Sequence, residues 1–108
     1  MLRRVLVLRL RADAAADDVR QLEEALRSLP AKIPDIREWH LSRNLSSMRP
    51  GQRPYSHVWE VTFSDLDALR RYQTDPYHAE RVHPFFDKSN AQCVVEEYFA
   101  VYYEVGEE

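Results

Sequence analysis

A tyrosine and a histidine on either side of an Asp-Pro pair are the side chains of this sequence best suited to chemistry. Tyr72 precedes Asp75-Pro76, and His78 follows it. A proline disfavours helical geometry in the residue before it and fits the first position of a helix, so we expect one helix to end near Tyr72 and another to begin at Pro76. The short turn between them lets both side chains face one cavity. A neutral imidazole can accept a proton, and a phenol can donate a hydrogen bond to a carbonyl or enolate oxygen.

The surroundings of His78 leave its role open. A helix N-terminus disfavours the protonated imidazole, whereas the nearby Asp75 favours it, so the sequence does not fix the net direction of the pKa shift. His78 shares a helical face with Val82 and Phe86 and is predicted to point inward. It could equally be a core histidine bonded to a carbonyl or to Tyr72, and Tyr72 could serve only in packing.

A predicted strand and helix lead up to this pair. The strand spans Tyr55–Phe63, and on one of its faces it carries His57, Trp59, Val61 and Phe63. Ser64 is the predicted N-cap of the following helix. We interpret His57 as a packing residue or polar brace more than as a catalyst.

The rest of the chain supplies three more strands and one helix. We expect strands at Leu2–Leu10, Ile36–Leu41 and Gln92–Glu104, and a long, mobile loop over Asn44–Pro54 that acts as a lid. An apolar stripe at helical spacing predicts a helix that Pro30 stops near Leu29; its members are Val19, Leu22, Leu26 and Leu29. The predicted order is β-α-β-β-α-β, an α+β, ferredoxin-like arrangement in a single domain over residues 1–108.

The strands place apolar side chains on both faces of this sheet, although its helices can cover only one. Phe99 and Val101 alternate with Tyr98 and Tyr102, and Trp39 and Trp59 add bulk on the other strands. We therefore expect a second copy of the chain to cover the open face, which makes the protein a symmetric homodimer.

Composition excludes several classes of function. The 108 residues carry a net charge of -3, which argues against nonspecific nucleic-acid binding. The single cysteine excludes an internal disulfide, and no apolar run is long enough to cross a membrane. The start, MLRRVLVLRLR, is interpreted as a strand and not a leader, so we expect a cytoplasmic protein. His40 and His83 lack partners at metal-ligand spacing, and we expect no metal and no cofactor.

Several of these residues together resemble the stress-responsive dimeric α+β barrel family, often called Dabb. The resemblance is strongest over residues 55–82 and lies in Tyr55-x-His57, Glu60-Val61-Thr62-Phe63, Tyr72, Asp75-Pro76 and His78. It implies two sheets that close into a barrel, with a cavity between sheet and helices in each subunit. In cyclases that this chain is similar to, a histidine at the position of His78 and a tyrosine six residues earlier form the catalytic pair. The family often has a histidine near the position of Arg4, and Arg4 could instead bind a carboxylate or reach solvent.

The sequence thus predicts a small-molecule-binding or cyclase-like protein acting on polyketide or aromatic metabolites. His78 and Tyr72 are the predicted catalytic residues, and the predicted ligand contacts are His57, Trp59, Phe63, Val82, Phe85, Phe86 and Arg4. The alternative is a non-catalytic, stress-associated dimer whose cavity is merely core, and a cofactor-free monooxygenase on the same fold is a third option. Whether the protein is an enzyme stays open at this point.

Overall fold

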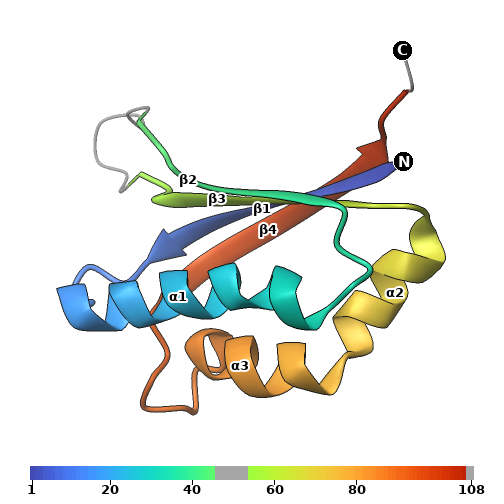
Figure 1. Cartoon of the computed structure of the whole chain (residues 1–108). Coiled ribbons are helices and arrows are strands. Elements are labelled where there is room, and N and C mark those ends of the chain that lie inside the picture. The colour runs from blue at the N-terminus through green and yellow to red at the C-terminus, as the bar shows by residue number, and fades with distance from the viewer. Residues whose placement is uncertain (46–53, 107–108) are drawn as a thin grey trace.

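The structure, a computed structural model, describes residues 1–45 and 54–106. Within these ranges the elements are β1 (Leu2–Leu10), α1 (Ala16–Lys32), β2 (Glu38–Arg43), β3 (His57–Phe63), α2 (Leu66–Thr74), α3 (Pro76–Phe86) and β4 (Val95–Glu104). The strands form one antiparallel sheet in the order β2-β3-β1-β4, and the helices lie together on one of its faces (Figure 1). This confirms the predicted α+β, ferredoxin-like fold. Among the described helices, none combines the length and apolar character needed to cross a membrane.

The central strand β1 fixes which side chains face the helices. Leu2, Leu6 and Leu8 are buried on this side, and their β3 partners Phe63, Trp59 and His57 share the same face because directly opposed residues in an antiparallel pair point the same way. Arg4 lies on the same face of β1 as these leucines, and it pairs with Val61 on β3 and Tyr102 on β4. It therefore projects from an otherwise apolar row toward the helices.

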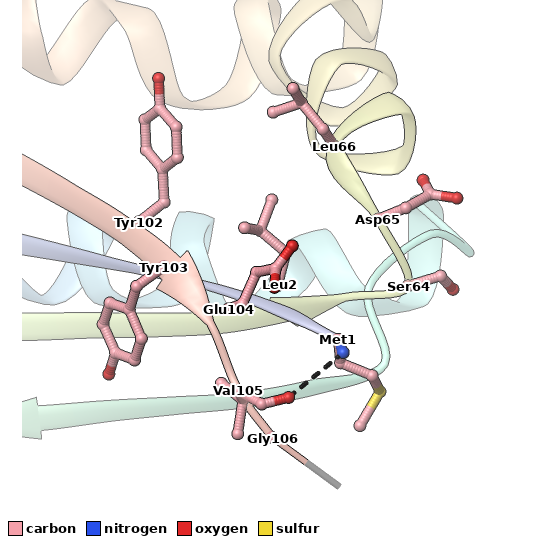
Figure 2. Close-up of a pocket in the computed structure, with 10 residues that line it drawn as sticks. All are labelled: Met1, Leu2, Ser64, Asp65, Leu66, Tyr102, Tyr103, Glu104, Val105 and Gly106. Atoms are coloured by element: carbon pink, nitrogen blue, oxygen red, sulfur yellow. Dashed lines mark hydrogen bonds between the residues drawn. The ribbon is translucent and has the colours of Figure 1, made fainter.

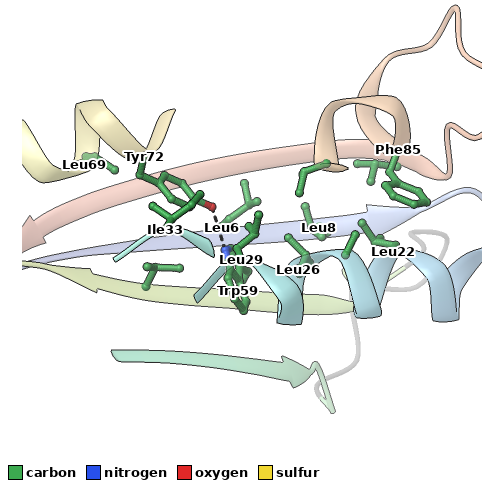
Figure 3. Close-up of a cluster of buried hydrophobic side chains, with 14 of the residues drawn as sticks. Leu6, Leu8, Leu22, Leu26, Leu29, Ile33, Trp59, Leu69, Tyr72 and Phe85 are labelled. Carbon is green, nitrogen blue, oxygen red and sulfur yellow. Dashed lines mark hydrogen bonds between the residues drawn. The ribbon is translucent and has the colours of Figure 1, made fainter. Parts of the chain in front are cut away.

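The core fills the space between this face and the helices (Figure 3). Leu22, Leu26 and Leu29 of α1 are at most 1% exposed, as predicted, whereas Val19 of the predicted stripe is only partly buried. Trp59 and Tyr72 are the largest fully buried side chains, so the aromatic pair of β3 and α2 anchors this layer.

Helix α1 continues past Pro30 to Lys32, so the predicted end near Leu29 is wrong. A proline late in a helix forfeits one backbone hydrogen bond, but its fixed φ is compatible with helical geometry. Ile33 is 1% exposed, and its N–H donates to Leu29 O at 2.9 Å. Burial of Ile33 thus favours one further turn over the stop that Pro30 suggests.

Strand boundaries differ from the predicted ones by two or three residues. β2 spans Glu38–Arg43, not Ile36–Leu41; β3 begins at His57, and β4 at Val95. A turn in which the Cys93 N–H donates to Asn90 O at 3.0 Å precedes β4, so the strand begins at Val95 and not at Gln92. Most of the predicted Asn44–Pro54 loop falls within residues 46–53, which lie outside the described residues.

The open face of the sheet is apolar only on its β1–β4 side. Phe99, Val101 and Tyr103 are 45–51% exposed there, beside Val5 and Val7. On the β2 side, this face carries Glu38, His40 and Ser42, by the register with β3. Trp39, Trp59 and Tyr98, which the sequence counted among the apolar side chains on the two faces together, all lie on the helix face.

The N-cap of α2 is Asp65 and not the predicted Ser64. The Asp65 carboxylate accepts a hydrogen bond from the Ala68 N–H at 2.9 Å. Ser64 instead uses its hydroxyl to accept from Arg37 Nε at 3.1 Å on the surface. A carboxylate at this position also suits the positive end of the helix, which explains the preference for Asp65.

We expect Asp65→Ala to lower the free energy of unfolding by about 1 kcal/mol, because a helix cap is lost. Ser64→Ala is the matched control and should cost less, since it removes only an exposed contact. Urea unfolding of both variants measures the difference. Equal losses, or a larger loss for Ser64→Ala, would contradict the assignment of the cap.

Candidate active site

A cavity of about 130 Å³ lies between the sheet and the helices. Its lining comes from β1, α1, α2, α3 and β4, and consists of Arg4, Leu6, Leu26, Tyr72, His78, Val82, His83, Phe86 and Tyr98. An apolar cavity of about 150 Å³ admits benzene, so this one holds roughly a single ring or a short chain. His83 and Tyr98 are exposed, which places the opening of the cavity beside them.

Tyr72 reaches the cavity from α2 and is held in place from the sheet. Its hydroxyl accepts a hydrogen bond from Trp59 Nε1 at 3.2 Å, which leaves its own proton free to donate (Figure 3). Burial raises the pKa of Tyr72, against the opposing effects of the Trp59 hydrogen bond and the Arg4 charge. The phenol therefore stays protonated at neutral pH and can donate to a ligand oxygen.

His78 is the third residue of α3, a helix that begins as predicted. The Asp75 carboxylate accepts from the Tyr77 N–H at 2.8 Å, and Pro76 occupies the first helical position. The His78 ring packs against that of Tyr72 with centroids 4.6 Å apart, and buried His78 Nδ1 has no hydrogen-bond partner in the described part of the chain. His78 lines the cavity, and a buried ring nitrogen without a protein partner makes it a candidate ligand contact.

The pKa of His78 is lowered to about 4, first by burial and then by unfavourable electrostatic interactions with His83 and Arg4, while Asp75 opposes the shift. The sequence left this direction open, and the structure decides it through burial. At pH 7 the imidazole is neutral and can accept a proton.

Arg4 brings a cation into the same cavity. It is partly buried, and its Nε is buried without a hydrogen-bond partner among residues 1–45 and 54–106. The cavity thus combines a cation, a neutral imidazole and a phenol within apolar walls, an arrangement typical of small-molecule sites.

The structure brings together five of the nine predicted site residues. Tyr72, His78, Arg4, Val82 and Phe86 line the cavity. The other four do not line it: Trp59 supports Tyr72, Phe63 packs on the Tyr72 ring at 5.1 Å, and Phe85 is 3% exposed in the core. His57 lies away from the cavity, at the start of β3. The roles assigned to all nine stay predictions.

His57 belongs to a separate polar cluster that joins β3 to α1. His57 Nε2 lies 3.0 Å from Glu23 Oε2, and its Nδ1 lies 2.8 Å from Ser56 Oγ. Burial raises the pKa of Glu23, but the His57 hydrogen bond and the Arg43 charge outweigh it and leave that pKa below its usual value. Glu23 is 6% exposed, so the cluster compensates a buried carboxylate and acts as the polar brace that the sequence suggested.

His83, Tyr98, Leu6 and Leu26 also line the cavity, and sequence reasoning did not place them there. His83 was judged only as a metal ligand, yet its ring lies 5.2 Å from that of His78. The inward stripe of α1 could have pointed to Leu26. Nothing in the sequence gives the distance between β4 and α3, so the position of Tyr98 at the cavity could not be predicted.

A larger hollow of about 690 Å³ lies at the end of the sheet where the termini meet, lined in part by Leu66, Tyr102 and Glu104 (Figure 2). No histidine lines it among the described residues, and its Asp65 carboxylate caps α2. The smaller cavity is therefore the candidate active site. In the described residues, no group of three or more His, Cys, Asp or Glu side chains is arranged to hold a metal ion.

Comparison with known proteins places this geometry in a wider group. The stress-responsive A/B barrel domain matches residues 2–100. An uncharacterized protein of Streptomyces coelicolor is 32% identical over 82 residues, which cover 72% of this chain and 79% of that protein.

Two solved structures illustrate the range of this fold. A dimeric, ferredoxin-like protein of unknown function from Bacteroides fragilis is 25% identical, with a TM-score of 0.73 over 96% of this chain and 95% of that one. The hydroxynitrile lyase of Passiflora edulis is 19% identical, with a TM-score of 0.78 over 99% and 94% of the two chains. At the latter identity, the likeness shows the fold.

The lowered pKa of His78 predicts a pH dependence of stability. The pKa of His78 is about 4 in the folded protein and near its ordinary value of 6.5 in the unfolded chain. As the pH falls, the unfolded chain is therefore protonated at His78 before the folded protein is. The free energy of unfolding should therefore decrease between pH 6.5 and 4, and decrease less steeply in His78→Gln. Urea unfolding at several pH values measures both slopes. The contribution of Glu23 is common to both proteins and cancels, so identical slopes would contradict the prediction.

Proposed function

This chain belongs to the stress-responsive A/B barrel domain family, and we propose that it binds a small carbonyl compound and catalyses proton transfer at the carbon next to the carbonyl. The observation that carries the proposal is that His78, Tyr72 and Arg4 line one cavity whose other walls are mainly apolar, and that His78 Nδ1 is buried without a partner in the described residues. The ligand class is an aromatic or polyketide-like metabolite, of which one ring or its precursor segment would occupy the cavity.

The proposed step uses both members of the pair. His78 Nδ1 accepts a proton from the carbon, the C–H electrons form the enolate double bond, and the carbonyl π electrons move to oxygen. The Tyr72 O–H donates to that oxygen while Trp59 Nε1 fixes the phenol. In a cyclase the enolate carbon then attacks a second carbonyl of the same molecule, and His78 returns its proton to the new alkoxide.

The low pKa of His78 has two consequences for this step. The imidazole is available as a base throughout the neutral range, but it is a weak one. Negative charge that develops on the bound oxygen attracts the imidazolium and raises the His78 pKa as the proton moves. A site that carries the Arg4 charge is therefore suited to a carbonyl oxygen on which negative charge develops during the reaction.

We expect the protein to accelerate hydrogen–deuterium exchange at the carbon between the two carbonyl groups of acetoacetamide, followed by proton NMR in D2O. His78→Gln should reduce the exchange rate by roughly 10²-fold or more, as for loss of a general base, and Tyr72→Phe should also reduce it. Tyr77→Phe is the matched control, because it too removes a hydrogen-bonded helical hydroxyl, the one that donates to Ser28 Oγ at 2.9 Å.

The non-catalytic alternative makes a different forecast for the same variants. A cavity that is merely core gives no exchange above the buffer rate, and His78→Gln then changes stability alone. Wild-type protein without exchange activity would overturn the proposed reaction.

We further propose that two chains pair through the open face of the sheet. The exposed apolar side chains of β4, beside the half-buried Val5 and Val7 of β1, support it, and the Bacteroides fragilis protein is described as dimeric.

Light scattering should give twice the chain mass of 12.8 kDa. Val101→Asp should shift the protein toward monomer or unfold it, because a charge enters a buried apolar contact. Tyr102→Asp is the control. Tyr102 follows Val101 on β4 and is similarly exposed, 55% against 51% for Val101, but it points to the opposite face of the sheet. Equal mass for Val101→Asp and wild type would contradict pairing through this face.

A further inference from the structure

The arginines of β1 differ in what they bind. Arg3 Nε donates to Thr62 Oγ1 at 3.4 Å, and Arg9 Nε donates to Glu96 Oε2 at 3.0 Å. Arg4, which points into the cavity, has a buried Nε without a hydrogen-bond partner in the described residues. A buried donor left unpaired costs free energy, so Arg4 is the member of this set that is prepared for an external partner.

The charge of Arg4 is not compensated inside the cavity. Its described lining contains no aspartate or glutamate. Asp75 acts electrostatically on His78, but its carboxylate accepts the Tyr77 N–H and caps α3. A guanidinium in apolar surroundings without a counter-ion favours an anionic ligand.

The geometry and size of the cavity restrict which anion fits. A guanidinium presents planar, paired donors that match a carboxylate. One cation beside a neutral imidazole compensates a single negative charge, which favours a monoanion over a phosphate dianion. The volume of about 130 Å³ leaves room for a carboxylate and only a few further atoms.

We infer that the cavity binds a small oxo-carboxylate, with its carboxylate on Arg4 and its carbonyl oxygen toward the Tyr72 hydroxyl. The contact between the carbonyl oxygen and Tyr72 rests on the proposed function, whereas the contact between the carboxylate and Arg4 does not depend on it. The anionic end then orients the carbon next to the carbonyl toward His78. Arg4 is thereby a specificity-determining residue, which selects acids over the corresponding neutral amides and esters.

The test compares acetoacetate with acetoacetamide, two ligands of nearly the same shape that differ in charge. NMR titration should give a dissociation constant for acetoacetate at least roughly tenfold lower than that for acetoacetamide. Arg4→Gln should abolish this preference by weakening acetoacetate binding alone, and Arg4→Lys should retain part of it. Arg3→Gln is the matched control, because Arg3 lies next in sequence and points to the open face.

The comparison in wild-type protein stands even if a variant fails to fold. Equal affinity for the two ligands, or no binding of acetoacetate, overturns the inference. If acetoacetamide exchange still depends on His78 in that case, the proposed proton transfer survives. Tight, Arg4-dependent binding of acetoacetate without any exchange supports the carboxylate site and overturns the proposed reaction instead.

Discussion

The hydrogen bond from the Trp59 indole to the Tyr72 hydroxyl is the contact on which the candidate site depends. It joins a fully buried tryptophan of the sheet to α2, where a polar pair with little competition from solvent is strongly oriented. Because Trp59 can only donate, the Tyr72 oxygen must accept, and its proton is directed elsewhere. Packing of the Phe63 and His78 rings on Tyr72 then fixes the histidine relative to the same hydroxyl.

The position of the cavity follows from unequal coverage of the sheet. Leu6 and Trp59 near the centre are buried beneath the helices, whereas Tyr98 on the edge strand β4 is 53% exposed although it faces the same side. The helix layer thins toward β4, and the space that remains opens beside Tyr98 and His83. A ligand would enter from this edge, with its far end close to Arg4 and Tyr72.

Two buried polar clusters in this protein are built on opposite principles. Glu23 is compensated by His57 and Arg43, so the cluster is satisfied and stabilises the packing of α1 on β3. Arg4 and His78 contribute buried nitrogen atoms that the described residues do not satisfy. Native proteins rarely leave such atoms unpaired without a function, which separates a structural histidine from a candidate catalytic one more clearly than residue type does.

The sequence by itself determined the order of the elements, the alternation of side chains along β3 and β4, and the Asp75–Pro76 helix start, because these follow from local periodicity and backbone restrictions. It also indicated Tyr72 and His78 as a pair. Tertiary structure alone decided that α1 passes Pro30 to bury Ile33, that Asp65 and not Ser64 caps α2, and that Trp59 and Phe63 support the cavity from behind. It also brought His83 and Tyr98 to the opening and lowered the His78 pKa to about 4. Burial and charge proximity arise only when distant segments pack, and no local pattern contains them.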